Sequence, residues 1–177
     1  MLRKVFMFLT ILLGLLIVIG LVLPNKLLVE KSTRIAASPI TIFRLLNNFE
    51  QYPQWSPWHD ESMIYEQLGA DQGVGAILNW QSDSKGEGQI EIVEAEPYKK
   101  ISMRMGFAGQ GSVNTIFLFE PSDRGTLVRW QYQLDLAAVE NPFYRITGRY
   151  MALLMDDWIA TDFDRGLDRL KRILENT

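Results

Sequence analysis

Residues 5–23, VFMFLTILLGLLIVIGLVL, contain no charged side chain and nothing more polar than Thr10. An α-helix rises about 1.5 Å per residue, so this stretch is just long enough to cross a hydrocarbon core of roughly 30 Å. Arg3 and Lys4 precede it, as in a secretory signal, but the apolar region of a signal is normally shorter and no small-x-small cleavage site follows here. The sequence therefore predicts an uncleaved transmembrane signal anchor over residues 1–26.

Basic residues lie on both sides of this stretch, with Arg3 and Lys4 before it and Lys26 and Lys31 after it. A short basic tail in front of a first membrane helix usually stays in the cytoplasm. We therefore expect a single-pass membrane protein with its main domain on the extracytoplasmic side, which in a bacterium is the periplasmic side of the inner membrane. The chain has no cysteine, so a lipid attached through cysteine cannot be the anchor, and disulfides and thiolate chemistry are excluded.

Charge limits the partners of the remaining chain. Residues 1–26 carry three basic groups and no acidic group, which leaves 15 basic and 21 acidic groups, or a net charge of −6, in residues 27–177. An acidic domain is repelled by phosphate backbones and anionic headgroups. We expect no nucleic-acid partner, and any membrane contact beyond the anchor has to be hydrophobic.

The chain after the anchor predicts one α+β domain. Residues 27–37 alternate enough to form a strand, and Ser38 followed by Pro39 is a typical N-cap and first turn of a short helix. The aromatic stretch YPQWSPWHDE, residues 52–61, contains two prolines that limit it to a short turn and loop. Six glycine-punctuated runs then predict an antiparallel meander: 63–68, 75–82, 88–96, 99–107, 112–120 and 126–136.

The C-terminal region changes to a helical period. Asn141-Pro142 starts it, and apolar residues then recur every three or four positions, at Ile159, Phe163, Leu167, Leu170 and Leu174. Gly148 and the DDW at 156–158 suggest a break between a first helical piece and the main helix. One sheet with a long helix laid over it is the predicted architecture.

Three motifs resemble one family: WSPW at 55–58, GVGA..NW at 73–80 and DF..GL..LK at 162–171. Over about residues 28–175 the chain resembles the SRPBCC (START-like, polyketide cyclase/dehydrase-like) superfamily, and more narrowly its bacterial branch with a single N-terminal membrane helix. The resemblance implies a helix-grip fold, in which a curved antiparallel sheet of about seven strands wraps around the long C-terminal helix, with two short helices after the first strand. It also implies a hydrophobic tunnel, but no single reaction, because members include lipid carriers, receptors, aromatase/cyclases and chaperone co-factors.

Large apolar side chains on the expected inner face are the candidate lining of that tunnel. Flexible methionine beside rigid tryptophan suits a pocket that adapts to varied apolar ligands, although the simpler alternative is that most of these residues are core. The candidates are Trp58, Trp80, Met103, Met105, Phe117, Trp130, Tyr132 and Trp158.

Polar candidates for chemistry are few. With one histidine and no cysteine, the sequence predicts no metal site, and it points to no cofactor. The glycines of GADQGVGA feed a strand rather than a helix, so a hairpin is favoured over a phosphate loop. His59, Arg104 and Tyr132 are the only plausible catalytic side chains; none has an evident partner, and alternation turns Arg104 to the outer face.

The sequence thus predicts a membrane-tethered domain that binds a hydrophobic small molecule or lipid without transforming it. The first alternative is a polyketide cyclase/dehydratase-like enzyme, and the second is a structural or protein-interaction module; the sequence does not identify a protein partner. A binding domain should have an open apolar cavity, and an enzyme should have polar groups converging inside it. An interaction module should have a closed interior and an exposed apolar patch.

Overall fold

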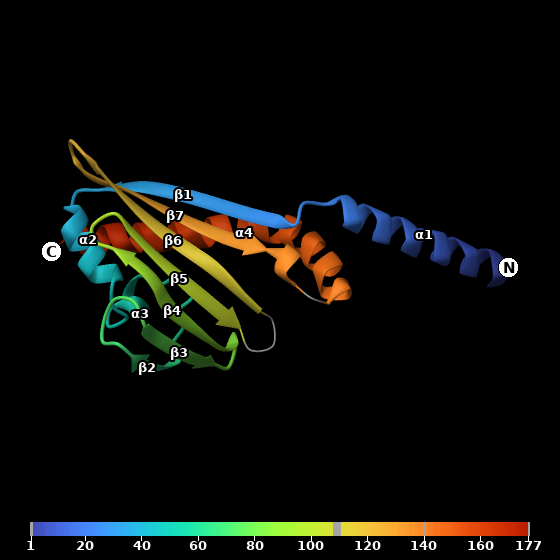
Figure 1. Ribbon diagram of the computed structural model, residues 1–177, viewed down its shortest axis with the longest axis horizontal. Coiled ribbons are helices and arrows are strands. Elements are labelled where there is room, and N and C mark those ends of the chain that lie inside the picture. The colour runs from blue at the N-terminus through green and yellow to red at the C-terminus, as the bar shows by residue number, and fades with distance from the viewer. Residues whose placement is uncertain (1, 108–110, 140, 177) are drawn as a thin grey trace.

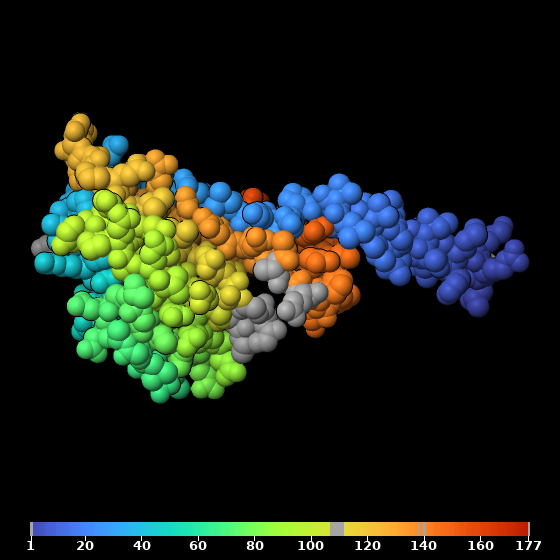
Figure 2. Space-filling view, viewed as in Figure 1, coloured from blue at the N-terminus to red at the C-terminus, as the bar shows by residue number. Residues whose placement is uncertain are grey.

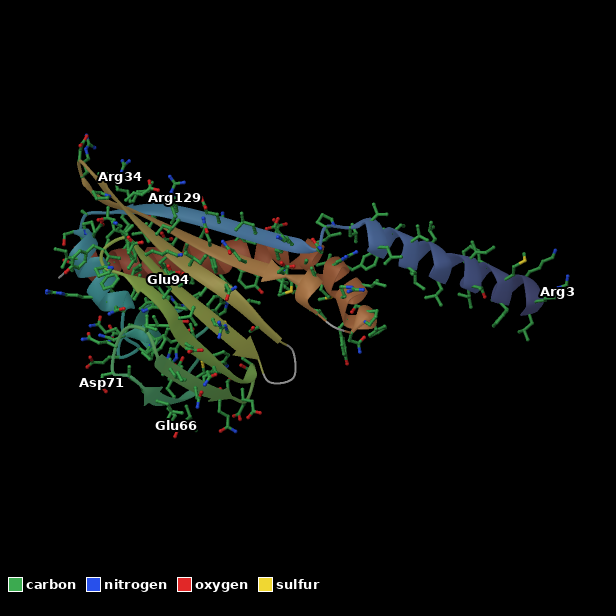
Figure 3. The ribbon with its side chains drawn as sticks, in the orientation of Figure 1. Arg3, Arg34, Glu66, Asp71, Glu94 and Arg129 are labelled. Carbon is green, nitrogen blue, oxygen red and sulfur yellow. The ribbon has the colours of Figure 1, made fainter. Side chains whose placement is uncertain are left out.

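The computed structural model describes residues 2–107, 111–139 and 141–176. Helix α1 (Leu2–Val22) projects from the rest of the molecule as a rod, and its large apolar side chains are almost all exposed (Figures 1 and 2). Among the described residues it is the one helix long and apolar enough to cross a membrane, as an anchor or as a signal sequence. Figure 3 shows Arg3 at the far tip of this rod, away from the charged side chains of the domain.

The domain is built on a seven-stranded antiparallel sheet with the order β1-β7-β6-β5-β4-β3-β2. Consecutive strands from β2 to β7 are neighbours, as the predicted meander requires, and β1 closes the sheet by pairing with β7. The strands are β1 (Lys26–Ile35), β2 (Ile64–Gly69), β3 (Ala76–Ser82), β4 (Gly86–Glu96), β5 (Lys100–Phe107), β6 (Gly111–Ser122) and β7 (Gly125–Asp135). With the long C-terminal helix, this arrangement confirms the α+β helix-grip fold.

Two short helices follow β1, namely α2 (Pro39–Leu46) and α3 (Tyr52–Trp55). The Ser38 side chain accepts a hydrogen bond from the backbone N–H of Thr41, which is the N-cap that the sequence predicts. A 3₁₀ turn, η1 (Leu136–Ala138), leads from β7 toward the last helix, α4 (Pro142–Glu175), which runs along β1 (Figure 1).

The predicted break in the C-terminal helix is wrong, because α4 is a single helix of 34 residues. A glycine inside a helix costs only about 1 kcal/mol, which the rest of a long helix offsets. At Gly148 an added Cβ would lie 2.8 Å from Leu136 Cδ2, so this glycine allows η1 to approach the helix. Asp156 and Asp157 have exposed side chains and need no helix end to accommodate them.

The core lies between one face of the sheet and the helices α2, α3 and α4. Strand β7 shows why: Val128, Trp130 and Tyr132 are buried, while Arg129 and Gln131 between them are partly exposed. This is the two-residue alternation of a strand with one buried face. The buried face of the sheet is therefore the surface on which any interior site has to be built.

Candidate functional site

An aromatic cluster occupies the space between the sheet and α4. The ring of Trp130 on β7 stacks on Phe163 of α4 with centroids 3.9 Å apart and on Phe117 of β6 at 4.7 Å. Trp55 and Trp58 each meet Trp130 edge to face at 5.7 Å. These five side chains join sheet, α3 and α4 into one packed unit, which we call the aromatic cluster.

Few polar atoms lie inside this interior. Trp130 Nε1 donates a hydrogen bond of 2.5 Å to Thr115 Oγ1, and Thr115 donates to the carbonyl of Gln131 at 3.1 Å. Burial raises the pKa of Tyr132 to about 12, so its phenol is a neutral O–H at ordinary pH. Trp55 Nε1 is buried and has no hydrogen-bond partner in the described part of the chain. The described part of the interior is thus largely apolar, and the Trp55 indole N–H in it is a donor without a partner.

The structure brings most candidate lining residues to this face but leaves one outside. Met103, Met105 and Tyr132 are buried, and Trp80 packs over Gly88, where an added Cβ would lie 2.2 Å from its ring. The other candidates in the interior are Phe117 and Trp130, with Trp58 partly buried beside them.

Trp158 is 70% exposed on α4, so the expected interior position of Trp158 is wrong. Its neighbour Ile159 occupies the inward-facing position instead. One residue turns a helix by about 100°, which is enough to move a side chain from the core to the surface.

The aromatic cluster itself is closely packed, with the ring centroids of these described side chains 3.9 to 5.7 Å apart. Two hollows among the described residues lie on the surface, with volumes of about 310 and 470 Å³. The first lies between the α2–α3 region and β2, and the second lies at the ends of β1 and β7. Neither is lined by any of the eight candidate residues.

The stretch around Trp58 is tied to the fold on both sides. Trp58 Nε1 donates to Asp162 Oδ2 of α4 at 2.9 Å, and the Lys85 ammonium donates to the Trp58 carbonyl at 2.6 Å. Arg169 of α4 donates to the Ser56 carbonyl at 2.6 Å. Asp162 and Arg169 lie seven residues apart, about two turns, so their shared helix face was readable from the sequence, although their target was not.

Two of the three candidate catalytic side chains lie away from the interior. His59 Nδ1 is 2.9 Å from Tyr65 Oη, and the two rings stack beside the edge strand β2. Arg104 is 3.6 Å from a Glu91 carboxylate oxygen and is half exposed, on the outer face that alternation predicts. Tyr132 is the one of the three whose side chain is buried with the aromatic cluster.

Three serine hydroxyls surround the carboxylate of Asp60, in the loop that follows Trp58. Asp60 accepts hydrogen bonds from the Ser62 hydroxyl at 2.5 Å and from the Ser82 and Ser84 hydroxyls, each at 3.0 Å. These bonds, that of Ser62 first, lower the pKa of Asp60 from 3.8 to about 2. These bonds tie the loop after Trp58 to Ser82 at the end of β3 and to Ser84 in the turn that follows it.

The Asp60 cluster predicts an acid-dependent loss of stability. Because the folded pKa is depressed, the stabilisation is present above the unfolded pKa of 3.8 and is lost as the pH falls toward about 2. We expect the free energy of unfolding of the wild type to fall across this window more steeply than that of Asp60→Asn. Parallel slopes in chemical denaturation series from pH 5 to pH 2 would contradict a role for the carboxylate.

Comparisons with known proteins agree with this geometry. Residues 26–175 match the model of a family described as "Polyketide cyclase / dehydrase and lipid transport". No curated protein matches the chain in sequence. Among solved structures, the protein of unknown function SA2116 from Staphylococcus aureus superimposes with a TM-score of 0.66 at 13% identity, covering 85% of this chain and 94% of that one.

Two further structures have the same fold. An uncharacterized protein from Rhizobium leguminosarum has a TM-score of 0.59 at 18% identity, with 86% of this chain and 96% of that chain covered. The di-domain ARO/CYC StfQ from the steffimycin biosynthetic pathway has a TM-score of 0.60 at 11% identity, with 86% and 51% covered. At these identities the likeness establishes the fold alone.

Proposed function

Because the chain belongs to the polyketide cyclase / dehydrase and lipid transport family, we propose that it binds an apolar molecule between the sheet and α4, without transforming it. The observation that carries the proposal is the buried Trp55 indole N–H, which has no hydrogen-bond partner among the described residues. Leaving such a donor unpaired costs about 1–3 kcal/mol. A carbonyl, ester or hydroxyl oxygen on a ligand would accept its hydrogen, so the ligand class is an apolar molecule with at least one oxygen.

Movement of side chains beside the closely packed aromatic cluster would make room for this ligand. Met103 and Met105 lie on the inner face of β5, both almost fully buried. Methionine is unbranched and has three rotatable bonds, so it changes shape more readily than the aromatic residues around it. We propose that these two methionines yield to the ligand while the aromatic cluster keeps the sheet and α4 in place.

The proposed location is a membrane surface, with residues 1–26 as an uncleaved anchor and residues 27–177 as the binding domain. Arg149 of α4 donates to the carbonyls of Gly20 and Leu21 in the last turn of α1, at 2.8 and 2.9 Å. Tyr150 Oη donates to the Leu16 carbonyl at 2.5 Å. A cleaved signal would leave these contacts unmade, which supports an anchor that stays attached. Such an anchor holds the interior close to the bilayer, where apolar molecules dissolve.

A cyclase or dehydratase is the second candidate function. The buried Tyr132 phenol favours it, because a side chain that stays protonated in an apolar interior can donate a proton or a hydrogen bond to a substrate carbonyl. In both functions the bound molecule carries an oxygen that accepts a hydrogen bond from an interior side chain. The two functions differ in whether the bound molecule leaves chemically changed, by loss of water or by closure of a ring.

Native mass spectrometry of the full chain, extracted in mild detergent, tests the proposal. We expect a stoichiometric apolar molecule on the wild type and on Trp158→Phe, a matched control because Trp158 is exposed. Trp55→Phe keeps an aromatic ring but removes the donor, so we expect its occupancy to fall roughly three- to tenfold.

Three results would argue against the proposal. An empty wild type that also fails to take up a fluorescent fatty acid would contradict ligand binding and favour a structural or interaction module. Equal ligand occupancy of Trp55→Phe and wild type would show that the Trp55 indole N–H does not bind the ligand. A copurified molecule that loses water or gains a ring on incubation would favour the enzyme.

A further inference from the structure

The N-terminal half of α4 carries an apolar face that no other part of the described chain covers. Five side chains on it are 48 to 70% exposed, at spacings that place them on one side of the helix. This apolar face consists of Phe143, Tyr144, Met151, Leu154 and Trp158. Contiguous exposed apolar side chains of this kind mark contact with a partner or a membrane.

The face changes character along the helix. Steps of seven residues, about two turns, lead from Tyr144 through Met151 and Trp158 to Arg165 and Arg172. The first three side chains are apolar or aromatic and exposed, and the two arginines on the same side are exposed and charged. The side chains facing outward from α4 are thus apolar near its N-terminus and charged toward its C-terminus.

The apolar end is the end that touches α1. Besides the hydrogen bonds of Arg149 and Tyr150, the side chain of Ile146 packs so closely on Gly20 that an added Cβ there would lie 2.6 Å from it. In Figure 1 the first turns of α4 lie beside the end of α1 where the chain enters the domain. If α1 spans the bilayer, these turns lie at the level where the membrane ends.

The composition of the segment suits that level. Residues 141–155 contain two arginines and no acidic residue, although the domain as a whole is acidic, and the exposed pair Asp156 and Asp157 lies at the far end of the face, next to Trp158. Aromatic side chains with a polar group, such as Tyr144 and Trp158, favour the boundary between headgroups and acyl chains. A helix that lies in this boundary buries its apolar side about 5–10 Å below the headgroups.

We propose that the apolar face of α4 is a second membrane contact, inserted into the outer part of the same bilayer leaflet through which α1 leaves the membrane. The occupant is lipid, because the face continues directly from the contact with α1. This inference rests on α1 being the membrane anchor of the proposed function, and it is independent of whether the interior binds a ligand. It orients the domain with the N-terminal half of α4 against the bilayer and the C-terminal half in water.

Site-directed spin labelling of the full chain in phosphatidylethanolamine–phosphatidylglycerol vesicles tests this contact. The chain contains no cysteine, so each single cysteine substitution gives one label. Leu154→Cys reports on the apolar face, and Arg172→Cys is its matched control, 18 residues or about five turns further along the same side of α4. Leu13→Cys, at an exposed position of α1, reports on the anchor separately.

Collision with oxygen, which concentrates in lipid, is compared with collision with a water-soluble nickel chelate. We expect the ratio of oxygen to nickel accessibility to be several-fold higher for the Leu154 label than for the Arg172 label, and high for the Leu13 label. A Leu154 label as aqueous as the Arg172 label, with a lipid-exposed Leu13 label, would overturn the second contact while the anchor stands.

Two other outcomes also overturn the inference. A Leu13 label that is accessible to the nickel chelate and not to oxygen in lipid would contradict both the membrane anchor and the second contact. A Leu154 label shielded from both oxygen and nickel would mean that protein, such as a second copy of the chain, covers the face. Loss or retention of copurified ligand in the mass spectra has no bearing on these ratios, so failure of ligand binding is distinguishable from failure of the membrane contact.

Discussion

Phe163→Ala is expected to lower the free energy of unfolding by about 3–5 kcal/mol. Phe163 is fully buried, and its ring stacks on Trp130 at 3.9 Å and meets Trp58 at 6.1 Å and Tyr132 at 6.5 Å. Truncation removes the one ring of α4 in the aromatic cluster and leaves a cavity that rigid indole rings cannot close. Chemical denaturation of the full chain in detergent, followed by near-ultraviolet circular dichroism, measures the loss.

Phe143→Ala is the matched control, because it makes the same truncation on the same helix. Phe143 is 68% exposed, so its removal should change the free energy of unfolding in detergent by less than about 0.5 kcal/mol. Equal losses for the two variants would mean that α4 does not close the core through Phe163. A small loss for Phe163→Ala alone would show that the sheet and helix repack around the gap.

The order of elements was predictable because apolar residues alternate along a strand with one buried face and recur every three or four positions along a helix with one buried face. In β7, the alternating series Val128, Trp130 and Tyr132 predicted the inner face, and burial of the three side chains confirms it. The spacing of Ile159 and Phe163 likewise predicted the buried side of α4, and both are buried. The motifs around Trp55 and Gly166 added the family, which the match over residues 26–175 confirms.

Errors arose where a local pattern had more than one physical reading. A glycine inside a helical stretch marks either a weak point or a close approach, and at Gly148 it is the close approach of Leu136. Trp158 is large and apolar, as core residues are, but its place on the helix turns it outward. The exposed position of Trp158 follows from the three-dimensional arrangement, in which the N-terminal half of α4 extends beyond the sheet and contacts α1 (Figure 1).

The close packing of the aromatic cluster was beyond sequence reasoning for a different reason. Which residues face inward follows from periodicity, but whether their side chains meet or leave space depends on rotamers and on the distance between sheet and helix. The same limit applies to Trp55, because the absence of a partner for its N–H depends on where its neighbours' polar atoms lie. The identity of a bound molecule is one step further, since it also depends on how the side chains rearrange around that molecule.

Gly166→Ala is expected to destabilise the chain by about 1–3 kcal/mol, although alanine is the better helix former. Gly166 is the glycine of the DF..GL..LK motif, and an added Cβ would lie 2.5 Å from Trp130 Cζ3 and 3.1 Å from Pro57 Cδ. Trp130 cannot retreat, because Phe163 stacks on its ring and Thr115 holds its indole N–H. The close approach of indole and helix backbone is the physical reason for a glycine at this position.

Gly148→Ala is the control on the same helix, since both substitutions gain the same helix propensity of about 1 kcal/mol. Its added Cβ would meet Leu136 Cδ2, the end of a flexible side chain that can rotate away. We therefore expect Gly148→Ala to be neutral or stabilising in the same denaturation measurement that shows the loss for Gly166→Ala. Should both variants gain stability equally, Trp130 would not lie against the backbone of α4, and the aromatic cluster would have to be looser than its ring distances indicate. Such a loose cluster would leave room for a ligand without movement of Met103 and Met105.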